Sequence, residues 1–255
     1  MMLNVVNYNV NKYLTLIPFG DFHFGSKDCD VKIFEAHIDL IKAEKDCAVI
    51  LMGDLINCGT FASIGARTYD DKYNPEEQYE RMLEYLRPIK KKIIGAHIGN
   101  HEERIRELSS FDIIKMLCRE LKVPYLGYSA LHKIKVNNVN FHIYSTHGST
   151  SATTITGKMN KSRKAQENAD ADIYLCGHTH ALDYNTQPFF RINNRARTVE
   201  EHTKHFILTG NFVKWDGSYG EKKNYQMLTI GVPKIKLFGE LSRGMKKVEV
   251  KFTDK

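Results

Sequence analysis

The 255-residue sequence has few cysteines, only five, and none of them form a Cys-x-x-Cys pair. Scattered thiols in odd number provide no disulfide framework, so we expect reduced, mostly buried cysteines. No stretch approaches the ~18 apolar residues of a membrane span. The N-terminal segment also lacks a charged stretch followed by a long apolar run. These absences argue against a disulfide-rich secreted protein and against a membrane partner, and they predict a cytoplasmic location.

The composition is that of a folded globular protein. Hydrophobic residues make up 42% and charged residues 26% of the chain, which leaves enough apolar material for a sizeable core. The sequence has no internal repeat and no low-complexity linker, so we expect a single domain over residues 1–255. Lys and Arg number 37 against 30 Asp and Glu, a formal charge of +7. This balance favours phosphate-containing partners without identifying one.

Short apolar runs rich in Val, Ile, Tyr and Phe predict buried strands. These runs cover residues 13–19, 47–52, 91–98, 140–145, 172–177 and 205–210. Apolar residues at helical spacing predict helices over 31–46, 75–89 and 103–121. Strands that alternate with helices in the first half of the chain indicate an α/β architecture.

The second half of the chain is richer in strand patterns. Residues 133–145 place an Asn-Asn turn between two alternating runs, which predicts a β-hairpin. Residues 226–238 and 246–252 are also strand-like. The intervening segment 183–204 is long and polar and carries Arg191, Arg195 and Arg197, so we expect a loop or an excursion that is either functional or mobile. Together these patterns predict a layered α/β sandwich.

Five polar clusters follow apolar runs in the first 180 residues. They contain Asp21 and His23; Asp54 and Asn57; Asn100, His101 and Glu102; His147; and His178 and His180. A pair of divalent metal ions needs a bridging carboxylate, together with oxygen and imidazole ligands on rigid elements. Strand ends are rigid, so we expect these side chains to converge on one rim of the sheets.

The clusters, taken in order, resemble the motif series of the calcineurin-like metallophosphoesterases. The resemblance runs from residue 20 to 180 and depends on Asp21-Phe-His23, Gly53-Asp54-x-x-Asn57, Gly99-Asn100-His101-Glu102, His147-Gly148 and Gly177-His178-Thr179-His180. Each pair alone is common in turns, whereas the ordered series is specific. The resemblance implies a two-sheet β-sandwich flanked by α-helices. Segments 218–225 and 231–237 also resemble phage-encoded and prophage-encoded members, which would place the protein in the host cytoplasm.

The resemblance also implies a role for each residue of the clusters. One metal ion would be bound by Asp21, His23 and His180, the other by Asn100, His147 and His178, with Asp54 bridging both. Mn²⁺ is the expected ion, with Fe, Zn²⁺ or Ni²⁺ as alternatives. Two such ions lower the pKa of a shared water, and the resulting bridging hydroxide attacks phosphorus in line.

His101 adjoins a ligand but is not assigned as one, and the resemblance implies that it is the catalytic acid. By the resemblance it protonates the leaving oxygen or stabilises its charge. In the phosphoprotein phosphatase branch an Asp orients this histidine and an Arg follows that Asp, whereas Asn57 and Cys58 stand here. An amide can hydrogen-bond an imidazole but cannot stabilise its charged form as a carboxylate does. A protein phosphatase of that branch is therefore not expected. Glu102 is interpreted as a first-turn residue of the next helix.

Several residues are candidates for substrate contact. Lys158, Lys161 and Arg163 lie shortly after His147 and, with Asn100, could hold a phosphate backbone. The alternative is that this basic run, like the one at 87–92, is a solvated surface. Trp215 and Tyr219 could stack on a base or close the sandwich.

Three functions remain open at this level. We favour hydrolysis of phosphodiesters in DNA, RNA or a nucleotide. The first alternative is a phosphomonoesterase of small metabolites or nucleotides. The second is a binding scaffold that keeps the fold without catalysis, which would predict lost ligands, whereas all seven ligand positions are filled.

Overall fold

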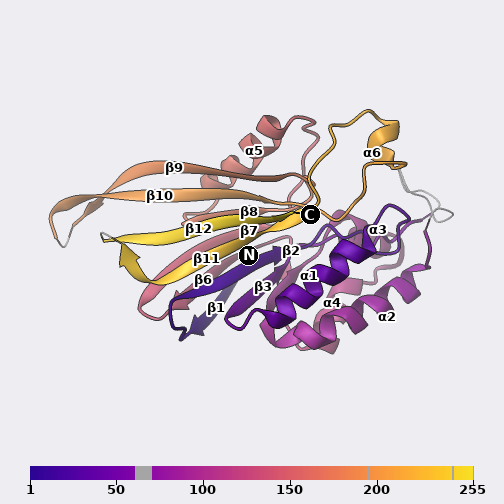
Figure 1. The fold of residues 1–255 in the computed structure, drawn as a ribbon, viewed down its shortest axis with the longest axis horizontal. Helices are drawn as coiled ribbons and strands as arrows, with labels where there is room; N and C mark the ends of the chain where they lie inside the picture. The colour runs from indigo at the N-terminus through magenta and orange to yellow at the C-terminus, as the bar shows by residue number, and fades with distance from the viewer. Residues whose placement is uncertain (61–70, 195, 243, 255) are drawn as a thin grey trace.

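The computed structural model describes residues 1–60, 71–194, 196–242 and 244–254, and its strands form two sheets of six strands each. Sheet A contains, in spatial order, β1 (Met2–Tyr8), β6 (Ser129–Val136), β7 (Val139–Thr146), β8 (Ile173–Cys176), β10 (Thr198–Thr209) and β9 (Leu182–Asn193). Sheet B contains β12 (Met245–Asp254), β11 (Gly231–Ser242), β2 (Tyr13–Phe19), β3 (Cys47–Leu51), β4 (Ile93–His97) and β5 (Tyr125–Gly127). The predicted two-sheet α/β sandwich is confirmed (Figure 1).

Helices cover the outer faces of both sheets (Figure 1). The helices of the described residues are α1 (Val31–Ala43), α2 (Pro75–Leu86), α3 (Asn100–Ser109), α4 (Ile113–Leu121) and α5 (Ile155–Arg163), with the short α6 (Tyr219–Lys222) in the loop after β10 and 3₁₀ turns η2 (Arg87–Lys92) and η3 (Lys164–Glu167). The group α1 to α4 lies on one side of the molecule and α5 on the opposite side. None of the helices formed by the described residues is long and apolar enough to cross a membrane.

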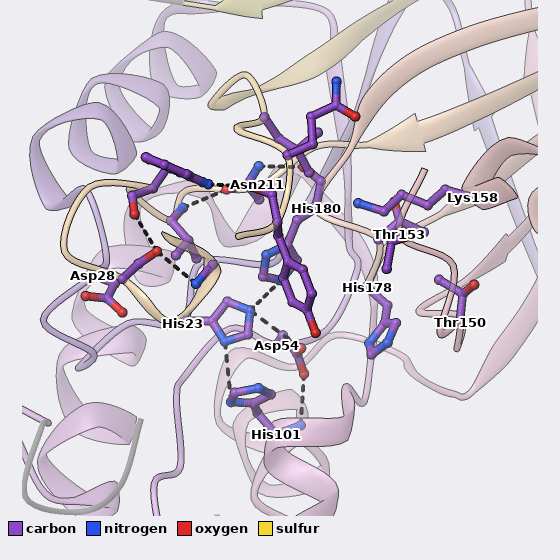
Figure 2. Close-up of a pocket in the computed structure, with 18 of the residues that line it drawn as sticks. His23, Asp28, Asp54, His101, Thr150, Thr153, Lys158, His178, His180 and Asn211 are labelled. Atoms are coloured by element: carbon purple, nitrogen blue, oxygen red, sulfur yellow. Dashed lines mark hydrogen bonds and ion pairs between the residues drawn. The ribbon is translucent and has the colours of Figure 1, made fainter. Parts of the chain in front are cut away.

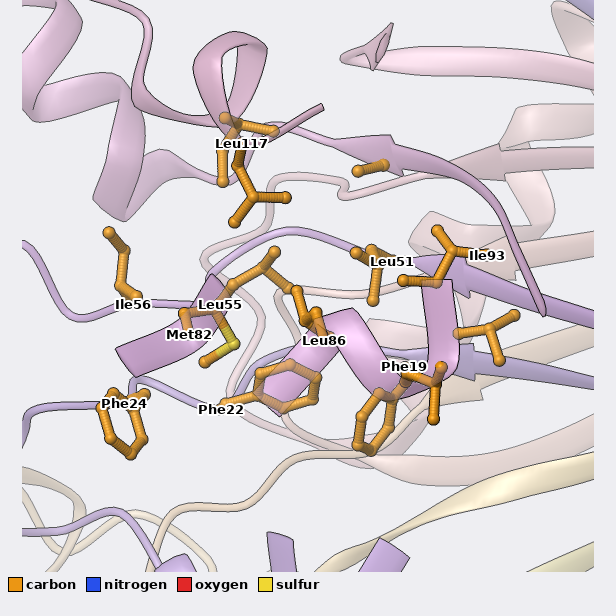
Figure 3. Close-up of a cluster of buried hydrophobic side chains, with 14 of the residues drawn as sticks. Phe19, Phe22, Phe24, Leu51, Leu55, Ile56, Met82, Leu86, Ile93 and Leu117 are labelled. Carbon is orange, nitrogen blue, oxygen red and sulfur yellow. The ribbon is translucent and has the colours of Figure 1, made fainter. Parts of the chain in front are cut away.

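The continuous apolar runs follow from burial of both faces of the central strands. Along β2, Leu14 and Leu16 point into the core between the sheets, whereas Ile17 and Phe19 point into the layer beneath the helices. Figure 3 shows this second layer, in which Phe19 packs near Leu86 of α2. A strand buried on both faces shows no apolar-polar alternation, which is why residues 13–19 are almost entirely apolar.

Local capping sets the starts of the helices that support the site. Asn74 and Glu77 form a reciprocal capping box at α2, with side-chain to backbone distances of 3.0 and 2.9 Å, and Pro75 occupies the first helical position. Asp30 accepts the amide of Ile33 at the start of α1, at 3.3 Å.

The single helix predicted over 103–121 is wrong, because the structure has two helices. Ser110 adopts a left-handed conformation with φ of 59°, which ends α3. Asp112 then accepts the amide of Lys115 at 2.8 Å and begins α4. The apolar spacing continues across this break because residues of both helices pack against the same core cluster.

The loop predicted over 183–204 is also wrong. These residues form most of the antiparallel pair β9 and β10, in which Asn193 faces Thr198 beside the turn. In Figure 1 the outer part of this hairpin projects beyond the sandwich. Phe190, Ile192 and Val199 are exposed there, so this part lacks the buried face that produces a readable strand pattern. Arg195 lies outside the described residues.

The other strand predictions are largely confirmed. Residues 133–145 form the hairpin of β6 and β7, with Asn137 at φ 51° in the turn. In the segment 226–238 the strand begins only at Gly231, and β12 covers 246–252. Lys91 and Lys92 belong to η2 rather than to β4.

Candidate dinuclear metal centre

The five clusters meet at one rim of the sandwich because the strands that precede them run the same way. β2, β3 and β4 are parallel in sheet B, and β7 and β8 are parallel in sheet A. Parallel strands place their carboxyl ends on the same edge. The loops that follow therefore bring together residues that are far apart in the chain, as Figure 2 shows.

The first group of donors consists of Asp21, His23, Asp54 and His180, whose ligand atoms lie within 4.8 Å of one another. His23 Nε2 is 2.9 Å from His180 Nε2. His180 Nε2 is 3.6 Å from Asp21 Oδ1, and His23 Nε2 is 3.6 Å from Asp54 Oδ2. Two imidazole nitrogens and two carboxylate oxygens in one small volume suit a divalent cation.

The second group consists of Asp54, His147 and His178, again within 4.8 Å. Asn100 completes it, because its Oδ1 lies 3.1 Å from His147 Nε2 and 2.7 Å from His178 Nδ1. Asp54 Oδ2 is 3.4 Å from His147 Nε2, so this one oxygen faces both groups. The structure thus brings all seven predicted ligand residues together and places Asp54 in both donor groups.

Supporting hydrogen bonds orient two of these ligands. His147 donates from Nδ1 to the carbonyl of Met52 at 2.8 Å, which leaves Nε2 directed at the donor group. The backbone amide of His178 donates to both carboxylate oxygens of Asp21, at 3.0 and 3.1 Å.

Five of the seven ligand residues have left-handed backbone conformations. Their φ values lie between 48° and 62°, and the residues are Asp21, His23, Asp54, His178 and His180. Such conformations are uncommon outside glycine and cost ~1–3 kcal/mol each, and they tend to cluster at functional sites. The fold therefore maintains strained turns at the positions where the donor atoms converge.

Glu102 fixes the turn that carries Asp54. Its side chain is fully buried and accepts the backbone amides of Asp54, Leu55, Ile56 and Gly99, at 2.6 to 3.1 Å. Burial and the Asp54 charge raise its pKa to about 7. Glu102 lies in the first turn of α3, as interpreted from the sequence, but its hydrogen bonds to the turn that carries Asp54 were not predicted. The sequence signal for a buried, hydrogen-bonded Glu102 was its position three residues after Gly99, at the start of a helix.

Gly99 allows α3 to approach Asp54 this closely. A Cβ at this position would lie 2.1 Å from Asp54 Oδ1. The helix start then donates the backbone amide of His101 to that same oxygen, at 2.9 Å.

Burial leaves most of the imidazoles neutral. It lowers the pKa of His23 to about 3, with a further contribution from His101, and it lowers the pKa of His180 well below the usual range. Neutral rings are the form that binds metal. His147 differs: burial opposes its charge, but Asp54, Asp21 and the Met52 carbonyl together outweigh burial and raise its pKa to about 10.

The two carboxylates carry the charge that metal ions would balance. Burial opposes ionisation of Asp54, yet His147 and neighbouring rings hold its pKa well below the usual range. Burial, together with the nearby charge of Asp54, raises the pKa of Asp21 well above its usual range. Divalent cations would relieve this repulsion and stabilise both anionic forms, so the residues present fit a dinuclear metal centre.

His101 lies beside the donors but belongs to neither group. Its Nδ1 is 2.8 Å from the backbone carbonyl of Asn57. The Asn57 side chain points elsewhere and donates to Asp71 Oδ1 at 2.6 Å. Asn57 thus contacts His101 through its main chain, not through the amide that the sequence suggested as a substitute for a carboxylate. No sequence signal indicated Asp71.

A cavity of about 430 Å³ opens over these residues. Asn100, His101 and Lys158 line it, whereas Lys161 and Arg163 do not. Lys161 is exposed, and Arg163 donates to Gln187 Oε1 at 3.1 Å and lies over the Phe206 ring. Of the three predicted basic contacts, only Lys158 faces the cavity.

The loop after β10 forms the opposite wall of the cavity. Trp215 lines it and donates from Nε1 to the carbonyl of Tyr225 at 2.8 Å, whereas the side chain of Tyr219 lies outside the described part. Asn211 also lines the cavity and donates to the carbonyl of His180 at 2.6 Å. The sequence analysis did not select Asn211, although it follows a strand and a glycine as Asp54 does.

The sequence profile of the calcineurin-like phosphoesterases matches residues 14–182, and the chain belongs to this family. The family and the Asp and His donor groups together support a metal-dependent phosphoester hydrolase. Comparison with curated proteins gives no match. Among solved structures the chain is similar to vacuolar protein sorting 29 from Cryptosporidium parvum. That match has 16% identity and a TM-score of 0.48 over 96% of this chain and 100% of the other.

Proposed function

We propose that this protein hydrolyses phosphodiesters of nucleic acid or nucleotides with two divalent metal ions, Mn²⁺ being the expected ion. The carrying observation is the position of Asp54 Oδ2, which lies 3.6 Å from His23 Nε2 and 3.4 Å from His147 Nε2. A shared carboxylate oxygen between two nitrogen-rich donor groups is what a bridged metal pair requires.

The residues of the site would divide the work as follows. When bound, the ions supply positive charge to the phosphoryl oxygens and activate water. Asp54 belongs to both ligand groups and would fix their relative position. Glu102 holds Asp54 in place by accepting the backbone amides of Asp54, Leu55 and Ile56. His101, oriented by the Asn57 carbonyl, faces the cavity and would protonate or stabilise the leaving oxygen.

The shape of the cavity supports a diester. A diester carries two organic groups, so the site must be open on two sides of the phosphorus. The lining extends from the donor groups toward Thr150 and Lys158 on one side and toward Trp215 and Tyr225 on the other. Aromatic side chains stack readily on nucleobases, which favours a nucleotide or a nucleic-acid strand.

A long electrostatic track for duplex DNA has less support. Lys161 and Arg163 do not line the cavity. Lys92, in the basic run 87–92, uses its ammonium group to bind the carbonyls of Ile41, Lys42 and Glu44. That run precedes β4, whereas the site follows β4, so it lies toward the other end of the strand.

The test is a substrate panel in Mn²⁺: bis-p-nitrophenyl phosphate, p-nitrophenyl phosphate, cyclic nucleotides, RNA, and single- and double-stranded DNA. We expect diester turnover to exceed monoester turnover. Asp54→Asn should abolish both, whereas Asp39→Asn, which changes an exposed carboxylate on α1, should not. Dominant monoester turnover would overturn the diester proposal in favour of a phosphomonoesterase. Absence of both bound metal and turnover would favour the scaffold.

A further inference from the structure

The side chain of Lys158 is mostly buried, and its ammonium group faces the cavity without a counter-charge from the described residues. The residue is only 9% exposed, on the inner face of α5. Among the residues that the structure describes, none forms an ion pair or a hydrogen bond with its ammonium group. Burial alone lowers its pKa, with no carboxylate to offset that effect. Partial removal of a cation from water without a partner is unfavourable, so an anionic ligand in the cavity would supply the missing counter-charge.

The surroundings of Lys158 make an anion more necessary. Lys158 is the fourth residue of α5, near the positive end of the helix dipole, where a cation is unfavourable. Lys158 also lines the same cavity as His178 and His180 of the two donor groups. Metal ions bound there would add further positive charge.

Hydroxyl groups lie beside Lys158 on the same wall of the cavity. Thr150, Ser151 and Thr153 line the cavity with it, and Figure 2 shows Lys158 directed into the cavity near Thr153. Thr150 Oγ1 accepts the amide of Ala152 at 3.0 Å, so its own proton remains available for donation. An ammonium group flanked by hydroxyls is suited to a phosphate group.

We propose that Lys158, with Thr150 and Thr153, forms a second anion subsite that binds the phosphate group adjacent to the one that is cleaved. This inference rests on the proposed function. Lys158 belongs to neither donor group, and the cleaved phosphoryl group already has the metal charges available. The substrate class is therefore a chain with two neighbouring phosphates. An oligonucleotide and a nucleoside oligophosphate share that chemistry, whereas a cyclic nucleotide does not.

The test compares three chromogenic diesters in the Mn²⁺ enzyme. They are the p-nitrophenyl esters of thymidine 5′-phosphate, of the same nucleotide carrying a 3′-phosphate, and of thymidine 5′-diphosphate. Lys158→Met should raise KM for at least one two-phosphate ester ~10–100-fold more than for the one-phosphate ester. Lys158→Arg should largely restore the difference. Lys164→Met, at an exposed lysine just after α5, should affect none of them.

The two esters that carry a second phosphate distinguish the two possible substrate classes. An effect on the 3′-phosphate ester alone identifies a strand of nucleic acid, and an effect on the diphosphate ester alone identifies an oligophosphate. An equal rise in KM for all three esters would assign Lys158 to the cleaved phosphoryl group and overturn the inference, with the diesterase function intact. Unchanged KM values for all esters would also overturn it.

A binding measurement tests the subsite even if no ester is hydrolysed. Calorimetric titration of the Mn²⁺-loaded protein with inorganic phosphate should detect two sites, and Lys158→Met should retain one. A single site in both proteins would overturn the inference. Two sites in the wild type without any diester turnover would retain the anion subsite while the proposed function fails.

Discussion

At the scale of single residues, His101 is held by two main-chain contacts and by the side chain of Arg104, whose guanidinium lies 3.2 Å from the ring Nε2. Its amide donates to Asp54 Oδ1 at 2.9 Å, and its Nδ1 lies 2.8 Å from the carbonyl of Asn57. The Asn57 carbonyl places the proton of the neutral ring on Nδ1, so Nε2 is the acceptor atom and faces the Arg104 guanidinium. The orientation of the ring thus depends on the loop conformation and on Arg104, and not on the identity of the Asn57 side chain.

We therefore expect His101→Ala to lower kcat by ~10²–10⁴-fold while two metal ions remain bound. The ring is absent from both donor groups, so its removal leaves every ligand atom in place. Steady-state rates on a p-nitrophenyl diester and metal content by mass spectrometry check the two halves of this prediction. His142→Ala, at an exposed position on β7, is the matched control. Loss of metal from the His101 variant would contradict the non-ligand role.

The ligand positions could be predicted from the sequence because each cluster of ligands follows an apolar strand. It could not indicate the contacts of Asn57 and Glu102. Asp71 binds Asn57 from 14 positions along the chain, and the amides bound by Glu102 at Asp54 to Ile56 lie 46 to 48 positions away. Such contacts depend on how loops from different strands pack together, which a single sequence does not encode in a periodic pattern.

At the scale of elements, the break between α3 and α4 depends on one residue. Ser110 has φ of 59° and ψ of 15°, a left-handed conformation that glycine adopts without strain. The sequence has serine there, so the usual signal for a helix end is absent, and the apolar spacing of the two helices continues across it.

Ser110→Gly should therefore stabilise the protein by ~0.5–1 kcal/mol, because relief of the left-handed strain exceeds the added flexibility of the unfolded chain. Urea unfolding measures the change. The matched control is Glu107→Gly, at an exposed position inside α3, which should destabilise by ~1 kcal/mol. If both glycines destabilise equally, Ser110 does not end the helix as the structure shows.

The outer part of the β9–β10 hairpin was not predicted from the sequence, for a different reason. A strand is recognised from sequence when one face is buried, because burial selects alternating apolar residues. The inner end of β10 is buried and was recognised, at residues 205–210. The outer ends have solvent on both sides, and apolar residues such as Phe190 and Ile192 are exposed there. The pattern around them is consequently that of a polar loop.

At the scale of the whole molecule, a chain of buried hydrogen bonds joins the two sheets. Asn4 Nδ2 lies 3.4 Å from His132 Nδ1, His132 Nε2 lies 2.6 Å from Ser145 Oγ, and His97 Nε2 lies 2.7 Å from the same oxygen. His97 Nδ1 donates to the carbonyl of Gly127, so its Nε2 must accept, and Ser145 must donate to it. All four side chains are satisfied only while both rings are neutral.

This arrangement predicts acid sensitivity. Burial lowers the pKa of His132 to about 4 and that of His97 to about 3. The unfolded chain, with histidine near its ordinary 6.5, then binds more protons than the folded protein, so stability falls as the pH drops from about 6.5 toward 4. His132→Gln retains a donor for Ser145 but does not titrate, so the free energy of unfolding should fall less steeply over this window.

Urea titrations at several pH values between 7 and 4 measure this slope. His142→Gln, which changes an exposed ring on the neighbouring strand, should keep the wild-type slope. Equal slopes for all three proteins would show that His132 does not contribute to the acid sensitivity.

Metal binding should stabilise the whole fold, because the rim combines five ligand residues in left-handed conformations with the two buried carboxylates of Asp21 and Asp54. Ligands that bind only the folded state stabilise it by ~3–4 kcal/mol when free metal exceeds its dissociation constant by 100- to 1,000-fold. Chelation should therefore lower the unfolding midpoint, and Mn²⁺ should restore it. Asp54→Asn removes the shared carboxylate and should lose most of this response, whereas Asp39→Asn should keep it. An unfolding midpoint that does not change with chelation would mean that the rim forms its strained turns without the ions, and the metal-centre assignment would fail.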